Sequence, residues 1–157
     1  MKPTLYLETT IISYLAARRS RDLVVAAHQR ITREWWSMRL RDFTVFHSEL
    51  VAEEAARGDT EAARRRIALL AQFDSVRIDE RVASLANSIV RSGCIPEKAG
   101  ADSVHIALAA VHDLNYLLTW NCTHINNAEI VSRIEEVCKR AGYRCPVICT
   151  PEELMGA

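Results

Sequence analysis

The 157-residue chain has no excess of charge of either sign, because 20 lysine and arginine residues balance 20 aspartate and glutamate residues. It therefore lacks the overall basic field of many nucleic-acid binders and the acidic field of a solvating tail. It also lacks any run of about 18 apolar residues that would span a membrane, and Glu8 interrupts the apolar N-terminal stretch too early for a secretory signal. We expect a cytoplasmic protein without membrane contact, whose function depends on local sites.

Several catalytic motifs are also missing. The chain contains no GxxxxGK[ST] or GxGxxG motif, which argues against the usual phosphate-cradling loops. No serine lies in a GxSxG context, so a hydrolase with a nucleophile elbow is unsupported. We find no linker, internal repeat or low-complexity segment. The chain is thus expected to form one domain over residues 1–157.

The five cysteines include no CxxC pair, and their number is odd. A chain of this length does not need disulfides for stability, so reduced thiols in a cytosolic core are the better interpretation. A zinc site is a minor alternative, although its spacings match no common ligand motif. Its ligands would be Cys122, His124, Cys145 and Cys149.

Hydrophobic residues make up 49% of the chain, and their spacing alternates between strand-like runs and helical stripes. The pattern predicts strands at 5–7, 43–46, 75–78, 116–120 and 147–149, with 116–120 as the central strand. It predicts helices at 11–15, 22–38, 48–58, 60–70, 80–91, 98–111 and 126–142. This alternation predicts a three-layer α/β/α domain with a mostly parallel sheet, whose ligand crevice lies at the carboxyl ends of the strands.

The helix expected at 22–38 contains two adjacent tryptophans. One apolar stripe would comprise Leu23, Ala27, Ile31, Trp35 and Met38. Trp36 does not share that face, which makes it a candidate interface anchor; partial burial within the domain is the alternative.

Only three of the 20 basic residues are lysines. Arginine favours planar, bidentate contacts with phosphate or carboxylate groups. Solvated helix faces explain most of these arginines, but a minority that contacts phosphate is possible. Two clusters stand out, at Arg18, Arg19 and Arg21 and at Arg64, Arg65 and Arg66.

Polar side chains occur where the predicted crevice would lie. Glu8 follows the first strand, Asn121 follows the strand at 116–120, and Asp102 begins the helix before that strand. Glu54 lies on the helix after the second strand, where Glu49 and Glu53 compete for the same role. Converging carboxylates without a balancing lysine or arginine repel one another unless a divalent cation neutralises them. Oxygen ligands suit Mg²⁺ or Mn²⁺.

Each of these residues also has a simpler explanation. Asp102 could cap a helix, while Glu8 and Asn121 could be ordinary turn residues. The three glutamates could form a solvated helix face with surface ion pairs such as those to Arg57. His105 and His124 could act as general bases, although packing and loop hydrogen bonding are more common roles for histidine.

Four segments resemble the PIN domains, most closely the VapC-type toxins of bacterial toxin–antitoxin pairs. They are YLETTIISYL at 6–15, SELVAEEAARGD at 48–59, ADSVHIALAAVHDLNYLLTWNCTHINN at 101–127 and CTPEEL at 149–154. The third segment is long and specific, whereas the others agree with the family mainly in their order and spacing. The resemblance covers nearly the whole chain.

This resemblance implies a metal-dependent ribonuclease that hydrolyses RNA phosphodiester bonds to 5′-phosphate and 3′-hydroxyl ends. Glu8 stands where the family usually has its first aspartate, whereas Glu54 and Asp102 match two further acidic positions. Asn121 stands where many members carry a fourth acid. The implied site holds Mg²⁺ or Mn²⁺ through Glu8, Glu54, Asp102 and Asn121, and Thr9, Thr119 or Asn126 could orient water or phosphate. Implied partners are RNA, a cognate antitoxin protein and a second copy of the chain in a homodimer.

Two other functions remain open. Glu8 is one methylene longer than aspartate and Asn121 carries no charge, so the chain could be a catalytically weakened PIN-like module that acts through RNA or protein binding. A DNA nuclease or repair factor would use the same chemistry as a ribonuclease, and only a comparison of substrates separates the two.

Overall fold

Five short parallel strands form the sheet in the computed structural model, which describes residues 1–157. They are β1 (Thr4–Leu7), β2 (Thr44–Ser48), β3 (Asp74–Val76), β4 (Tyr116–Leu118) and β5 (Val147–Cys149). Their order across the sheet is β3-β2-β1-β4-β5. The predicted α/β class with a parallel sheet is confirmed.

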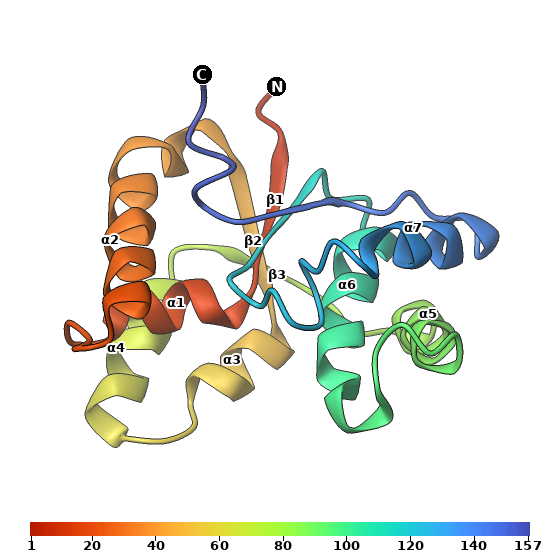
Figure 1. Ribbon diagram of the computed structural model, residues 1–157, viewed down its shortest axis with the longest axis horizontal. Coiled ribbons are helices and arrows are strands. Elements are labelled where there is room, and N and C mark those ends of the chain that lie inside the picture. Colours follow the sequence, from red (N-terminus) through yellow and green to blue (C-terminus); the bar gives the residue numbers. More distant parts are fainter.

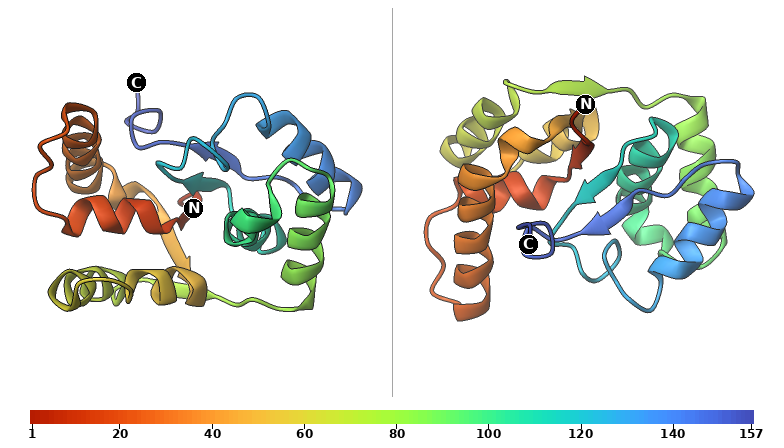
Figure 2. Two further views of the ribbon diagram at one scale, coloured as in Figure 1. Left: turned by 60° about the horizontal axis from the view of Figure 1, so that its bottom comes forward. Right: turned by 90° about the horizontal axis from the view of Figure 1, so that it is seen from above.

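Helices cover both faces of this sheet (Figure 1, Figure 2). One group comprises α1 (Thr9–Ala16), α2 (Leu23–Met38), α3 (Glu49–Ala55) and α4 (Thr60–Leu70). The other comprises α5 (Glu80–Arg91), α6 (Gly100–Val111) and α7 (Val131–Arg140), and two short 3₁₀ helices occupy Leu40–Asp42 and Glu97–Ala99. The chain first moves outward from β1 to β3 and then returns to β4 and β5, so right-handed crossovers place the two groups on opposite faces. None of the helices has the length and apolar character needed to cross a lipid bilayer.

The core is centred on β1. Its residues Leu5, Tyr6 and Leu7 are fully buried, as is usual for a parallel strand that helices cover on both sides. The strand predicted to be central, at 116–120, corresponds to β4, which lies between β1 and β5. Both strands are equally apolar, so the sequence could not tell which of them occupies the middle.

In several helices a side chain caps the first turn, so that the helix begins directly after a strand or loop. Glu8 caps α1 by accepting a hydrogen bond from the Thr10 N–H, and Ser48 caps α3 by accepting one from the Val51 N–H. The helix predicted from residue 126 begins later, because α7 starts at Val131, after Ile130 and without a side-chain cap. Asn127 instead stabilises the preceding turn by accepting a hydrogen bond from the Glu129 N–H.

The apolar stripe predicted for α2 is largely wrong. Leu23, Ala27 and Met38 are exposed, and the buried residues of the helix are Gln29, Thr32 and Trp35. Burial of the two polar residues is tolerated because both have hydrogen-bond partners outside the helix. The Thr32 hydroxyl accepts a hydrogen bond from the Trp120 indole (2.7 Å), and the Gln29 amide binds backbone groups of Arg18 and Ser20. Apolar periodicity alone does not reveal such partners.

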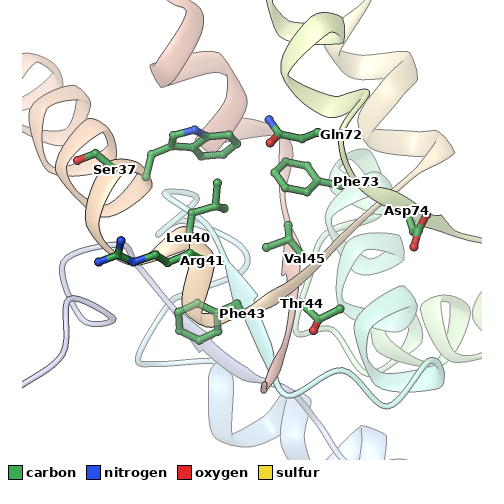
Figure 3. A pocket seen from close by; sticks show the side chains of 10 residues that line it. Ser37, Leu40, Arg41, Phe43, Thr44, Val45, Gln72, Phe73 and Asp74 are labelled. Atoms are coloured by element: carbon green, nitrogen blue, oxygen red, sulfur yellow. The ribbon is translucent and has the colours of Figure 1, made fainter. Parts of the chain in front are cut away.

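Trp36 is partly buried within its own domain. Its ring packs edge-to-face on Phe73, with 5.7 Å between the ring centroids. Together with Phe43 and Val45 it lines a surface cavity of about 430 Å³ beside the amino ends of β2 and β3 (Figure 3). The cavity is therefore at the opposite edge of the sheet from the carboxylates described next.

Candidate functional site

The predicted polar residues gather at the carboxyl ends of β1 and β4. Glu8 follows β1 directly, Asn121 lies three residues beyond β4, and Asp102 lies in the first turn of α6. Glu54 belongs to the last turn of α3, which follows β2. In a parallel sheet these segments meet at one edge, where ligands usually bind.

Glu8 is buried, with only 4% of its surface exposed, so the alternative of a solvated turn residue is wrong. One oxygen, Oε1, accepts hydrogen bonds from the hydroxyls of Thr10 (2.5 Å) and Thr119 (2.6 Å). The other, Oε2, accepts the Thr10 N–H at 3.2 Å. Glu8 therefore joins the end of β1 to the segment that follows β4.

Glu54 is the glutamate of α3 that reaches the site. Its Oε1 accepts hydrogen bonds from the Thr9 hydroxyl (2.8 Å) and from His105 Nε2 (2.6 Å). Its Oε2 has no hydrogen-bond partner in the protein. The competing Glu49 and Glu53 are exposed, and neither forms the ion pair considered with Arg57.

The environment of Glu54 favours its charged form. Partial burial alone would raise the pKa of this carboxyl group, but the hydrogen bonds from His105 and Thr9 and the positive charge of Arg57 lower it on balance. Glu54 therefore remains a carboxylate at neutral pH and can only accept hydrogen bonds.

A buried chain of hydrogen bonds continues from Glu54 into the core. His105 Nδ1 lies 2.7 Å from the Tyr6 hydroxyl, which lies 2.8 Å from the Ser48 hydroxyl. Because Glu54 only accepts, His105 donates to it from Nε2. When the imidazole is neutral, Nδ1 accepts, so that Tyr6 donates to His105 and Ser48 donates to Tyr6. The Ser48 oxygen in turn accepts the Val51 N–H. Burial raises the pKa of Tyr6, which keeps its proton on the ring oxygen.

Sequence reasoning considered His105 only as a general base or a packing residue, and it missed Tyr6 and Ser48. One available signal was Tyr6 itself, because a tyrosine in a fully buried strand needs a partner for its hydroxyl.

Asp102 binds a histidine and does not cap its helix. Its Oδ2 lies 3.0 Å from His124 Nδ1, and it accepts no backbone N–H. The helix-cap alternative is therefore wrong, although an acidic residue in the first turn remains favourable to the helix dipole. The Asp102 side chain is 19% exposed, so its free oxygen is accessible to a ligand.

Asn121 connects Asp102 to Glu8. Its Oδ1 accepts the His124 N–H (3.0 Å), as in a turn, and its own N–H donates to the Thr119 hydroxyl (2.9 Å), which donates to Glu8. Thr9, the neighbour of Glu8, extends the connection to Glu54. The four predicted site residues thus belong to two sets of hydrogen bonds, which the peptide bond between Glu8 and Thr9 joins. Together we call them the site network: Glu8, Thr9, Glu54, Asp102, His105, Thr119, Asn121 and His124.

No protein-family model and no curated protein matches the chain. What the site can do must therefore be argued from its own chemistry.

The three carboxylates of the site network have no lysine or arginine ion-pair partner. Only His105 and His124 contact Glu54 and Asp102, respectively. Asn126, the other polar residue considered, donates to Glu153 (3.0 Å) and not to the network. The ion-pair partners of the network carboxylates are therefore limited to these two imidazoles.

No set of three or more His, Cys, Asp or Glu side chains is arranged to hold a metal ion as the chain stands. This finding contradicts the zinc alternative. All five cysteines are free, and Cys122 is exposed whereas Cys149 is buried. The hydrogen bonds of the carboxylates show that each is held by hydroxyl or imidazole groups of the protein itself.

Proposed function

We propose that the chain is a Mg²⁺- or Mn²⁺-dependent endoribonuclease, acting as the toxin of a toxin–antitoxin pair. The observation that carries the proposal is the site network. It brings Glu8, Glu54, Asp102 and Asn121 together at the ligand-binding edge of a parallel sheet, and none of the three carboxylates has a lysine or arginine ion-pair partner. The resemblance to PIN domains suggests the reaction and the substrate.

The donor set suits a hard divalent cation, because every predicted ligand atom is oxygen. Oε2 of Glu54 and Oδ1 of Asp102 accept no hydrogen bond within the protein, so these two residues would hold the ion directly. Glu8 and Asn121 would share oxygens that already accept hydrogen bonds. A bound ion would lower the pKa of water and stabilise charge on the phosphate.

The protein's own residues keep the carboxylates in place for this task. The imidazole of His105 and the Thr9 hydroxyl fix Oε1 of Glu54 and leave its other oxygen free. The hydroxyls of Thr10 and Thr119 hold Glu8 in the same way. Such supporting hydrogen bonds orient ligands and commonly change activity by about 10- to 100-fold when lost.

The direct test is cleavage of end-labelled single-stranded and structured RNA by the purified protein with Mg²⁺, with Mn²⁺ or with chelator. We expect cleavage in either metal and none in chelator. Single-stranded DNA of the same sequence separates a ribonuclease from a DNA nuclease. Absence of RNA cleavage by the folded protein with both metals would contradict the proposal.

The second candidate function is a binding module with a weakened metal site. It is favoured by one observation: all four predicted ligands already form hydrogen bonds inside the protein, and no ready-made metal site is present. In this case the network would be structural, and the chain would act by binding RNA or a partner protein.

Thermal unfolding with Mn²⁺ distinguishes the two functions. An ion that binds only the folded state at 100 times its Kd adds about 2.7 kcal/mol, which would raise the Tm of a domain of this size by about 5–10 °C. We expect this shift for the wild-type protein and its loss in the Glu54→Gln, Asp102→Asn double variant. An unchanged Tm in the wild type would favour the binding module.

The proposed partner proteins are an antitoxin and a second copy of the chain. Their support is limited to exposed apolar side chains of α2, namely Leu23, Val24 and Met38, and to the partly buried Trp36. Light scattering is expected to give twice the chain mass of 17.7 kDa. A Leu23→Glu, Met38→Glu variant should reduce it to one chain mass, whereas a monomeric wild type would argue against the homodimer.

A further inference from the structure

The segment between α1 and α2, residues 17–22, carries three arginines, and we call it the arginine loop. Arg18, Arg19 and Arg21 are exposed. Their guanidinium groups form none of the ion pairs of the protein and donate no hydrogen bond within it. Three positive charges within four positions therefore remain available to a ligand.

The backbone of the arginine loop is held in a defined shape by a buried glutamine. Gln29 of α2 is only 2% exposed. Its Oε1 accepts the Ser20 N–H (2.9 Å), and its Nε2 donates to the Arg18 carbonyl (3.1 Å). The one acidic residue of the loop, Asp22, uses its carboxylate to cap α2 through the Val25 N–H. The loop thus presents its arginines from a supported backbone.

The second arginine cluster, in α4, has a structural role. Arg64 pairs with Glu61 (3.7 Å), and Arg66 donates to the Ala55 carbonyl at the end of α3 (2.8 Å). Arg65 donates to the Ala16 carbonyl (3.1 Å), the last residue of α1. These contacts satisfy free carbonyls at helix ends. Of the two arginine clusters, the arginine loop is therefore the one whose side chains have no structural role.

The arginine loop lies within reach of the site network. Helix α1 begins at Thr9, which binds Glu54, and leads to the loop at the foot of α2 (Figure 1). Its eight residues span about 12 Å at 1.5 Å per residue. Arg57, exposed and without an ion pair, follows α3 close enough to Glu54 for its charge to act on that carboxylate. Arg57 thus places positive charge near Glu54, and the arginine loop carries three more positive charges at the other end of α1.

We infer that the arginine loop binds the phosphate backbone of single-stranded RNA on one side of the bond to be cleaved. This inference rests on the proposed ribonuclease function. Guanidinium groups bind phosphate in bidentate geometry, and a chain with zero net charge needs such a local group of cations to attract a polyanion. The loop contacts backbone and not bases, so it contributes affinity without sequence preference.

The test is the salt dependence of RNA binding, measured in chelator so that no cleavage occurs. Fluorescence anisotropy with a labelled single-stranded RNA would compare the wild type with an Arg18→Gln, Arg19→Gln, Arg21→Gln variant. We expect about a tenfold or greater loss of affinity at low salt, and a slope of log affinity against log salt that is shallower by about 2. A matched control removes three exposed, unpaired arginines elsewhere: Arg41→Gln, Arg77→Gln and Arg91→Gln.

The control variant should keep wild-type affinity and slope. If the loop variant binds RNA as tightly as the control variant does, the inference about the loop is wrong. Cleavage by the wild-type protein with Mn²⁺ is scored separately. RNA cleavage together with an unaffected loop variant would overturn only the loop inference, whereas loop-dependent binding without wild-type cleavage would overturn only the nuclease.

Discussion

Replacing Asp102 with asparagine is expected to abolish metal-dependent RNA cleavage and to leave the fold intact. The amide keeps the size of the side chain and an oxygen that can face His124, but it removes the negative charge that would bind the cation. Metal stabilisation of a transition state amounts to several kcal/mol, so the rate should fall on the order of a thousandfold or more. Single-turnover cleavage of end-labelled RNA with Mn²⁺ measures the effect.

Asp113→Asn is the matched control for this experiment. Asp113 is exposed, and its side chain pairs only with Arg144 and with no residue of the site network. Its φ of 52° is in the left-handed region, which asparagine also tolerates. The control variant should cleave as the wild type does. Equal cleavage by the Asp102→Asn variant, with an unchanged Tm, would show that Asp102 does not hold the catalytic ion.

The fold was predictable where hydrophobic spacing and local caps agree. Helix α5 occupies the predicted residues, and the apolar residues that recur on one of its faces, Val82, Leu85, Ala86 and Ile89, are buried. The last strand, Val147–Cys149, also has its predicted bounds. The helix expected from residue 98 begins only at Gly100, after a 3₁₀ turn, because propensity alone does not separate these two helical forms.

Helix α2 shows where sequence patterns fail. Its buried Gln29 and Thr32 are polar, and they are tolerated because the arginine loop and Trp120 supply hydrogen bonds. The Trp120 partner is 88 residues away in the sequence. Such pairings depend on how helices pack on the sheet, which no local pattern encodes.

The site was predictable to a similar extent. The predicted alternation of strands and helices placed Glu8 and Asn121 at the carboxyl end of the sheet, where the structure has them. The choice of Glu54 over Glu49 and Glu53 came from the family resemblance and agrees with the hydrogen bonds seen here. The partners that hold these residues were not predictable, because Tyr6 and His105 meet across 99 residues of sequence.

Replacing Tyr6 with phenylalanine is the sharpest test of the buried hydrogen bonds that hold His105 in place. The change removes one oxygen atom and leaves the ring in the core, but it deprives His105 Nδ1 and the Ser48 hydroxyl of the hydroxyl group that both contact. A buried polar group without a partner costs about 1–3 kcal/mol. We therefore expect the free energy of unfolding in urea to fall by about that amount, with a decrease in Tm of about 2–12 °C for a domain of this size.

Tyr116→Phe provides the matched control, since Tyr116 lies on the neighbouring strand β4, is only partly buried and forms no side-chain hydrogen bond. Its stability should remain within about 0.5 kcal/mol of the wild type. The Tyr6→Phe variant should in addition bind Mn²⁺ more weakly, because a His105 ring without its partner at Nδ1 no longer fixes Glu54. If both variants were equally stable, the hydrogen bonds that join Ser48, Tyr6 and His105 would contribute nothing to folding.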